Sequence, residues 1–123
     1  SQVFSAMVSS FKAAAKGGRV VGLNIVGQES THVSMRDYLL HMKMFRFLKS
    51  RYPDVKVAMH AGELALGDVP PEDLQYHIDQ ALNIAGANRI GHGIDLAHES
   101  NAPAIRQAQS PWKKENLIPR CPR

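Results

Sequence analysis

The chain has 123 residues, 44% of them hydrophobic and 21% charged, which suits a single globular domain with one core. Its net charge of +4 comes from charges of both signs mixed along the chain, and no apolar run approaches membrane-spanning length. We therefore expect neither nucleic acid nor a membrane as a partner. The single cysteine, Cys121, excludes an internal disulfide and slightly favours the cytoplasm, although an exported parent protein is compatible with the same composition.

The first part of the chain predicts a helix and then a strand. Apolar residues recur three and four positions apart across residues 2–16, as on one face of a helix, and Gly17-Gly18 ends that helix. Residues 19–26 are rich in aliphatic side chains, which predicts a buried strand. The strand ends in a polar turn, Gly27-Gln28-Glu29.

A second helix and a second strand follow. Ser34 with Asp37 three residues later predicts a capping box at the start of the helix. The expected apolar stripe of this helix consists of Met35, Leu39, Met42, Phe45 and Leu48. A turn at residues 52–54 leads into a strand over residues 55–60.

The remaining sequence predicts another helix, a third strand and a short final helix. Pro70 and Pro71, followed by two acids, begin a helix that Gly86 ends. Its expected buried face consists of Leu74, Ile78, Ala81, Leu82 and Ala85. Residues 89–95 predict the third strand, and Asn101 caps a short helix over residues 102–109.

The order of these elements is a helix followed by three strand-helix pairs, which predicts an α/β fold with a parallel sheet. Right-handed crossovers place the helices of such units on one side of the sheet. In parallel β/α folds the functional groups gather where the strands end. Three polar sets occupy that place here, namely Gly27-Gln28-Glu29, His60 with Glu63, and His92.

The last two sets can carry hydrolytic chemistry. His60 offers an imidazole nitrogen to a metal, and Glu63 can donate or accept a proton. His92, on the neighbouring strand, can orient an attacking water or stabilise its charge. A zinc-activated water with a carboxylate and a supporting histidine forms a coherent hydrolytic set. The alternative from spacing alone is that both histidines are hydrogen-bonded structural groups.

The other four histidines, His32, His41, His77 and His98, are expected to be solvated or structural, because they lie in helices or in polar segments. No His-x-His pair occurs anywhere in the sequence. A catalytic zinc needs three protein ligands and an open position. Because His60 is the one convincing ligand, we expect that this chain cannot complete such a site alone.

Three motifs in series resemble the adenosine deaminase family. They are the strand and turn over residues 20–29, the tetrapeptide His60-Ala61-Gly62-Glu63, and the pentapeptide Arg89-Ile90-Gly91-His92-Gly93. The resemblance covers roughly residues 15–100. It implies a (β/α)8 barrel of the TIM type, one catalytic zinc ion (Zn2+), and hydrolysis of adenosine to inosine and ammonia.

Matched position by position, the resemblance assigns four roles. His60 resembles a zinc ligand, and Glu63 resembles the acid that protonates the purine ring nitrogen. His92 resembles the residue that positions and supports the attacking hydroxide. Gly27 resembles the turn glycine whose backbone contacts the purine, where a side chain would block close approach of the base. We expect Gly62 and Gly91 to serve the same need for room.

The chain also departs from the family pattern. The family usually has aspartate at the position of Asn24, and often an acid at the position of Gln28. The early His-x-His pair, which supplies two zinc ligands, is missing, and so is the late pair of aspartates, which supplies a further zinc ligand and a substrate contact. We therefore interpret residues 1–123 as a single partial domain, about strands four to six of the barrel, inactive by itself and able to self-associate through open sheet edges.

Two alternatives stay open. The parent enzyme could act on adenine or AMP instead of adenosine, although Gly91 favours a nucleoside. The chain could also be a non-catalytic homologue that binds a nucleoside or a partner chain, which would suit Asn24, Gln28 and the missing ligands.

Overall fold

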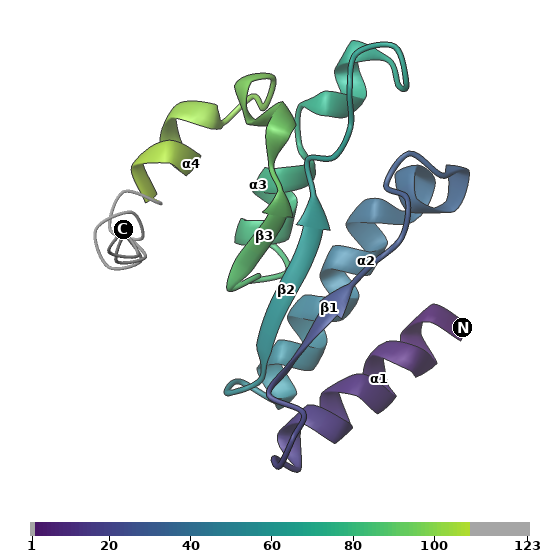
Figure 1. The fold of residues 1–123 in the computed structure, drawn as a ribbon, viewed down its shortest axis with the longest axis vertical. Coiled ribbons are helices and arrows are strands. Elements are labelled where there is room, and N and C mark those ends of the chain that lie inside the picture. The colour runs from purple at the N-terminus through teal and green to yellow at the C-terminus, as the bar shows by residue number, and fades with distance from the viewer. Residues whose placement is uncertain (1, 109–123) are drawn as a thin grey trace, which may run out of the picture.

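A computed structural model describes residues 2–108 of the protein, and its elements follow the predicted order (Figure 1). The elements are α1 (Gln2–Ala15), β1 (Gly22–Ile25), α2 (His32–Arg51), β2 (Lys56–Ala61), the 3-10 helix η1 (Pro71–Leu74), α3 (His77–Asn83), β3 (Arg89–His92), the 3-10 helix η2 (Ile94–Ala97) and α4 (Ala102–Ala108). None of the described helices is both long and apolar enough to cross a membrane.

The three strands form one parallel sheet in the order β1-β2-β3. Leu23 lies opposite Val57 in the first pair of strands, and Met59 lies opposite Ile90 in the second. The prediction of β/α units around a parallel sheet is therefore confirmed. The eight-stranded barrel around these units, and self-association through the outer strands β1 and β3, stay predictions.

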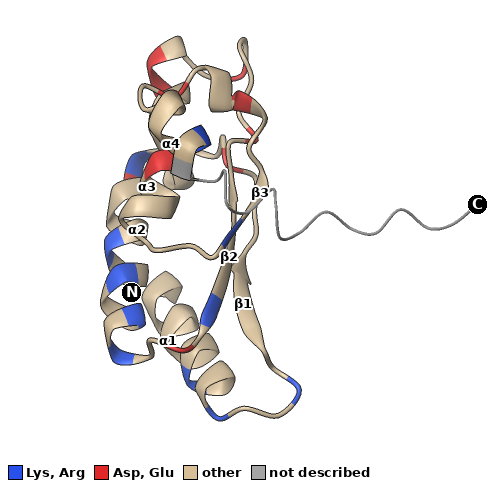
Figure 2. Ribbon diagram, turned by 90° about the vertical axis from the view of Figure 1, so that its left-hand side faces the viewer, with Lys and Arg blue, Asp and Glu red and all other residues tan. Residues whose placement is uncertain are grey.

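Helices α1, α2 and α3 lie on the same face of the sheet, as the right-handed crossover rule predicts (Figure 2). Every second residue of β2 is buried under them, namely Val57, Met59 and Ala61. These side chains pack with Phe11 of α1 and Phe45 of α2 in one hydrophobic core. The opposite face of β2 carries Lys56, which is exposed, and Ala58 and His60, which are partly exposed.

The predicted capping box of α2 is wrong. The helix begins at His32, and the main chain of Thr31 accepts the first helical hydrogen bond, from the N–H of Met35. The hydroxyl of Thr31 donates to that of Ser34, while Asp37 pairs with the guanidinium of Arg36 at 2.6 Å. No described side chain therefore caps the start of α2.

The buried stripe of α2 also differs from its prediction at one turn. Tyr38 is buried, whereas Leu39 is 41% exposed. The contact with α3 explains the difference, because the Tyr38 hydroxyl donates to the carbonyl oxygen of His77 at 2.9 Å. Buried tyrosines usually find such a partner for the hydroxyl.

The helix predicted after Pro70 is divided in two by residues 75–76, which separate η1 from α3. α3 begins at His77 because the carboxylate of Glu99 accepts the N–H groups of Ile78 and Asp79, at 2.6 and 3.3 Å. Free N–H groups at a helix start need such acceptors. A side chain far away in sequence therefore decides where this helix begins.

The third strand ends at His92, earlier than predicted, because both His92 and Gly93 have positive φ angles of 69° and 66°. This turn leads the chain out of the sheet and into η2. The final helix is present as α4, although Gln109, its predicted last residue, lies outside the described residues. The side-chain amide of Asn101 donates to Asp79 at 2.9 Å.

Candidate functional site

The three residues predicted to carry chemistry lie together at the carboxyl end of the sheet. The imidazole rings of His60 and His92 have their centroids 5.0 Å apart and are tilted by 52°. Nε2 of His92 lies 3.8 Å from Oε2 of Glu63. The side chains of His92 and Glu63 are 36% and 43% exposed, so water and small solutes reach both groups.

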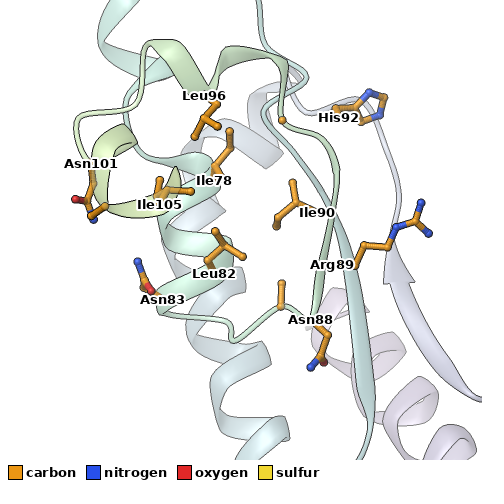
Figure 3. Close-up of a pocket in the computed structure, with 13 residues that line it drawn as sticks. Ile78, Leu82, Asn83, Asn88, Arg89, Ile90, His92, Leu96, Asn101 and Ile105 are labelled. Atoms are coloured by element: carbon orange, nitrogen blue, oxygen red, sulfur yellow. The ribbon is translucent and has the colours of Figure 1, made fainter. Parts of the chain in front are cut away.

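His60 and His92 reach the same face of the sheet by different routes. His60 points away from the helices by simple alternation, because its neighbours Met59 and Ala61 are buried under them. His92 pairs with Ala61, and alternation alone would turn it toward the helices. Its left-handed backbone redirects the side chain, and Figure 3 shows its imidazole pointing away from the helix side of β3.

The conformation of His92 carries a cost. A non-glycine residue in the left-handed region is disfavoured by about 1–2 kcal/mol. Strain of this kind persists where the surrounding structure imposes it, and such residues are concentrated at functional sites. Here the left-handed conformation of His92 places its imidazole beside His60 and Glu63.

The hydrogen bonds of His60 suit a metal ligand. Nδ1 lies 3.0 Å from the carbonyl oxygen of Ile25 and 3.2 Å from Oδ1 of Asn24. Because both partners are acceptors, Nδ1 carries the proton, and the lone pair of the neutral ring is on Nε2. Metal-binding histidines commonly donate their other N–H to a backbone carbonyl in this way.

The described residues do not form a complete metal site. Within residues 2–108, no three histidine, cysteine or carboxylate side chains are grouped so that they could hold a metal ion. His60 therefore fits zinc as one ligand of three. The other ligands would have to come from outside this part of the protein.

The glycines of the motifs have different physical roles. Gly27 is exposed, with φ at 156°, and no described atom lies within 4 Å of the position a Cβ would take. Space for a ligand is therefore open beside Gly27, and its contact with a purine stays a prediction. At Gly91 a Cβ would make only ordinary contacts, the nearest at 3.7 Å.

Gly62 does not serve the purpose expected for it. A Cβ there would lie 2.5 Å from Oδ1 of Asp95 and 2.7 Å from Cδ1 of Ile78. Both atoms belong to the protein's own buried side chains. Gly62 is therefore required for close internal packing and for its positive φ of 74°, and not to give room to a substrate.

The sequence reasoning missed a buried polar cluster directly beneath the Gly62-Glu63 turn. Glu29, expected in a polar turn, is only 5% exposed. Its carboxylate accepts the N–H groups of Gly62 and Glu63 and contacts Nδ1 of His77. His77, expected to be solvated or structural, is fully buried. A glutamate two residues after a strand-end glycine is the one sequence signal that could have indicated this.

Asp95 and Glu99 complete the buried cluster. Burial raises the pKa of Asp95 to about 6, and the nearby carboxylates of Glu29 and Glu99 add to the effect. Burial also raises the pKa of Glu99, although two backbone N–H groups oppose the change. Within the described part of the chain, neither carboxylate oxygen of Asp95 nor Nε2 of His77 has a hydrogen-bond partner.

A groove of about 670 Å³ lies beside β3, on the side of the strand that faces α3 and α4 (Figure 3). It is bounded by α3, β3 and α4, and Ile78, Leu82, Ile90 and Ile105 give it a largely apolar lining (Figure 3). Arg89 and His92 border the groove at β3, although their side chains point away from it (Figure 3). The groove therefore adjoins the candidate site at His92.

Comparisons with protein-family models, with curated proteins and with solved structures each give no match to this chain. Function therefore has to be inferred from the chain's own residues and their geometry.

Proposed function

We propose that the chain forms part of a zinc-dependent deaminase that hydrolyses adenosine to inosine and ammonia, and that it supplies the central strands of a (β/α)8 barrel. The observation that carries the proposal is the meeting of His60, Glu63 and His92 on the uncovered face at the ends of two parallel strands. That place is where parallel β/α folds assemble catalytic groups. The resemblance of the three motifs to adenosine deaminases supports the choice of this reaction.

In this proposal His60 contributes Nε2 to the metal, with Nδ1 held by Ile25 and Asn24. Zinc, when bound in such a site, acts as a Lewis acid and lowers the pKa of a coordinated water. The remaining protein ligands come from outside residues 2–108. This chain alone is therefore expected to bind zinc poorly and to be inactive.

The reaction adds water across the purine ring and then breaks the exocyclic C–N bond. Glu63 takes a proton from the attacking water and delivers it to the ring nitrogen. The hydroxyl that has been added to the ring carbon then gives up its proton to the amine, which leaves as ammonia while the carbonyl of inosine forms. His92 holds the attacking oxygen through Nε2, the nitrogen that faces Glu63 at 3.8 Å. Both groups are open to solvent, as proton exchange with water requires.

The test measures zinc by elemental analysis and ammonia release from adenosine, for this chain and for a longer chain that adds the remaining strands. We expect sub-stoichiometric zinc and no ammonia from the first, and one zinc with steady turnover from the second. Adenine and AMP are assayed in parallel to identify the substrate.

His60→Ala in the longer chain should remove the zinc, whereas His98→Ala, which changes an exposed histidine after η2, should not. Zinc retained at full occupancy in His60→Ala would contradict the ligand assignment. If the zinc-loaded longer chain bound a nucleoside but released no ammonia, the protein would be a nucleoside-binding protein and not an enzyme.

A further inference from the structure

We propose that Glu29 is a positioning residue, which sets the orientation of Glu63 by holding the backbone of the turn that precedes its side chain. Oε2 of Glu29 accepts the N–H of Glu63 at 2.7 Å, and Oε1 accepts the N–H of Gly62 at 3.1 Å. Oε1 also lies 2.5 Å from Nδ1 of His77. Three donors from two different segments therefore converge on one buried carboxylate.

The carboxylate itself is held firmly. His77 has no exposed surface, and its ring stacks on Tyr38 with centroids 3.7 Å apart and planes within 3°. The Tyr38 hydroxyl donates to the carbonyl oxygen of His77. Helices α2 and α3 thus fix His77, His77 fixes Glu29, and Glu29 fixes the turn.

The hydrogen bond to Glu29 gives Glu63 a fixed backbone although its side chain is exposed. Its side chain is 43% exposed, and exposed side chains on loops ordinarily sample several orientations. Its backbone N–H, however, is bound to a group in the core. The result is a solvent-accessible carboxylate on a rigid backbone, which lies within 3.8 Å of His92.

Only a carboxylate can satisfy all three donors, because an ionised glutamate accepts at both oxygens whereas glutamine must donate from one end. In either orientation of a glutamine at position 29, its NH₂ group faces the N–H of Gly62 or that of Glu63. One N–H of the turn then loses its acceptor, and an unsatisfied buried donor is strongly disfavoured.

Glu99 offers a matched control. It is a buried glutamate, 4% exposed, whose carboxylate also accepts two consecutive N–H groups, those of Ile78 and Asp79. Glu99→Gln therefore removes one backbone acceptor from the same core, as Glu29→Gln does, but at the start of α3 and not at the Glu63 turn.

The first measurement needs no substitution. Amide hydrogen exchange on the 123-residue chain should show the N–H of Glu63 protected, although the residue is exposed and lies outside β2. Exchange of the Glu63 amide at the rate of an unstructured peptide would overturn the proposal, whether or not any variant folds.

The second measurement compares Glu29→Gln with Glu99→Gln by NMR, using the nuclear Overhauser contacts between Glu63 and His92. We expect Glu29→Gln to weaken these contacts and to remove the protection of one amide of the turn, that of Gly62 or that of Glu63, and Glu99→Gln to preserve both. Equal changes in the two variants would show a role in general stability only, and would overturn the proposal.

The catalytic consequence rests on the proposed function. In the longer, zinc-loaded enzyme, Glu29→Gln should lower kcat about a hundredfold with KM and zinc content unchanged, since misplacement of a reacting group by about 1 Å costs that much. Glu99→Gln should leave kcat near its original value. Failure of the unmodified enzyme to release ammonia would refute the proposed function, while the exchange and NMR results would still decide the role of Glu29.

Discussion

Replacing Gly62 by alanine tests the packing beneath the candidate site. Two separate costs follow from the structure. The φ angle of 74° is left-handed, which disfavours any residue with a Cβ by about 1–2 kcal/mol. The new methyl group would also lie 2.5 Å from Asp95 and 2.7 Å from Ile78, and overpacking of this kind costs about 1–3 kcal/mol.

Gly17 provides the control that separates the overpacking cost from the backbone cost. It has the same φ of 74°, but no described atom lies within 4 Å of its Cβ position, so Gly17→Ala carries the backbone cost alone. We expect Gly17→Ala to destabilise by about 1–2 kcal/mol and Gly62→Ala by about 2–5 kcal/mol. The latter is a large part of the roughly 5–15 kcal/mol that stabilises a typical domain.

The assay is urea unfolding monitored by circular dichroism, with the free energy of unfolding taken from midpoints at a common slope. The difference between the two variants reports the collision with Asp95 and Ile78. If Gly62→Ala were no more destabilising than Gly17→Ala, the buried cluster would be loose enough to admit a methyl group, and the packing argument would be refuted.

Three further predictions concern charge and chemistry. The folded pKa of Asp95, about 6, exceeds its ordinary 3.8, so the folded state holds the proton more tightly and its stability falls as pH rises from about 4 to about 6. Asp95→Asn should remove this pH dependence. At 1.36 kcal/mol per pKa unit, the free energy of unfolding of the variant should rise by about 3 kcal/mol relative to that of the wild type between pH 4 and pH 7. Parallel curves of unfolding free energy against pH for the two proteins would refute the effect. Glu63→Gln in the longer enzyme should abolish ammonia release and keep zinc, and loss of zinc would make Glu63 a ligand instead of a proton carrier. His92→Ala should keep zinc and lower kcat by about 10²–10³-fold, and an unchanged kcat would exclude His92 from the reaction.

The conformation of His92 has two opposing effects. Its left-handed backbone costs stability, yet the same backbone brings its imidazole beside His60 and Glu63. Backbone strain of this kind is concentrated at functional sites, which supports the role proposed for His92.

The sequence by itself determined the order of the elements, the parallel pairing and the meeting of His60, Glu63 and His92 at one end of the sheet. These features follow from local periodicity, from short connections and from the fixed hand of crossovers, all of which depend on residues that are close in sequence. Periodicity also identified much of the core, including Phe45 and Ile78.

Only the tertiary structure decided the burial of Glu29, the start of α3 and the direction of His92. Glu29 is buried because donors 33 to 48 residues away converge on it, and Glu99 begins α3 from 20 and 21 residues downstream. His92 turns to the open face through a positive φ that strand alternation does not predict. Such contacts depend on which distant segments meet in space, and no pattern among adjacent residues encodes them.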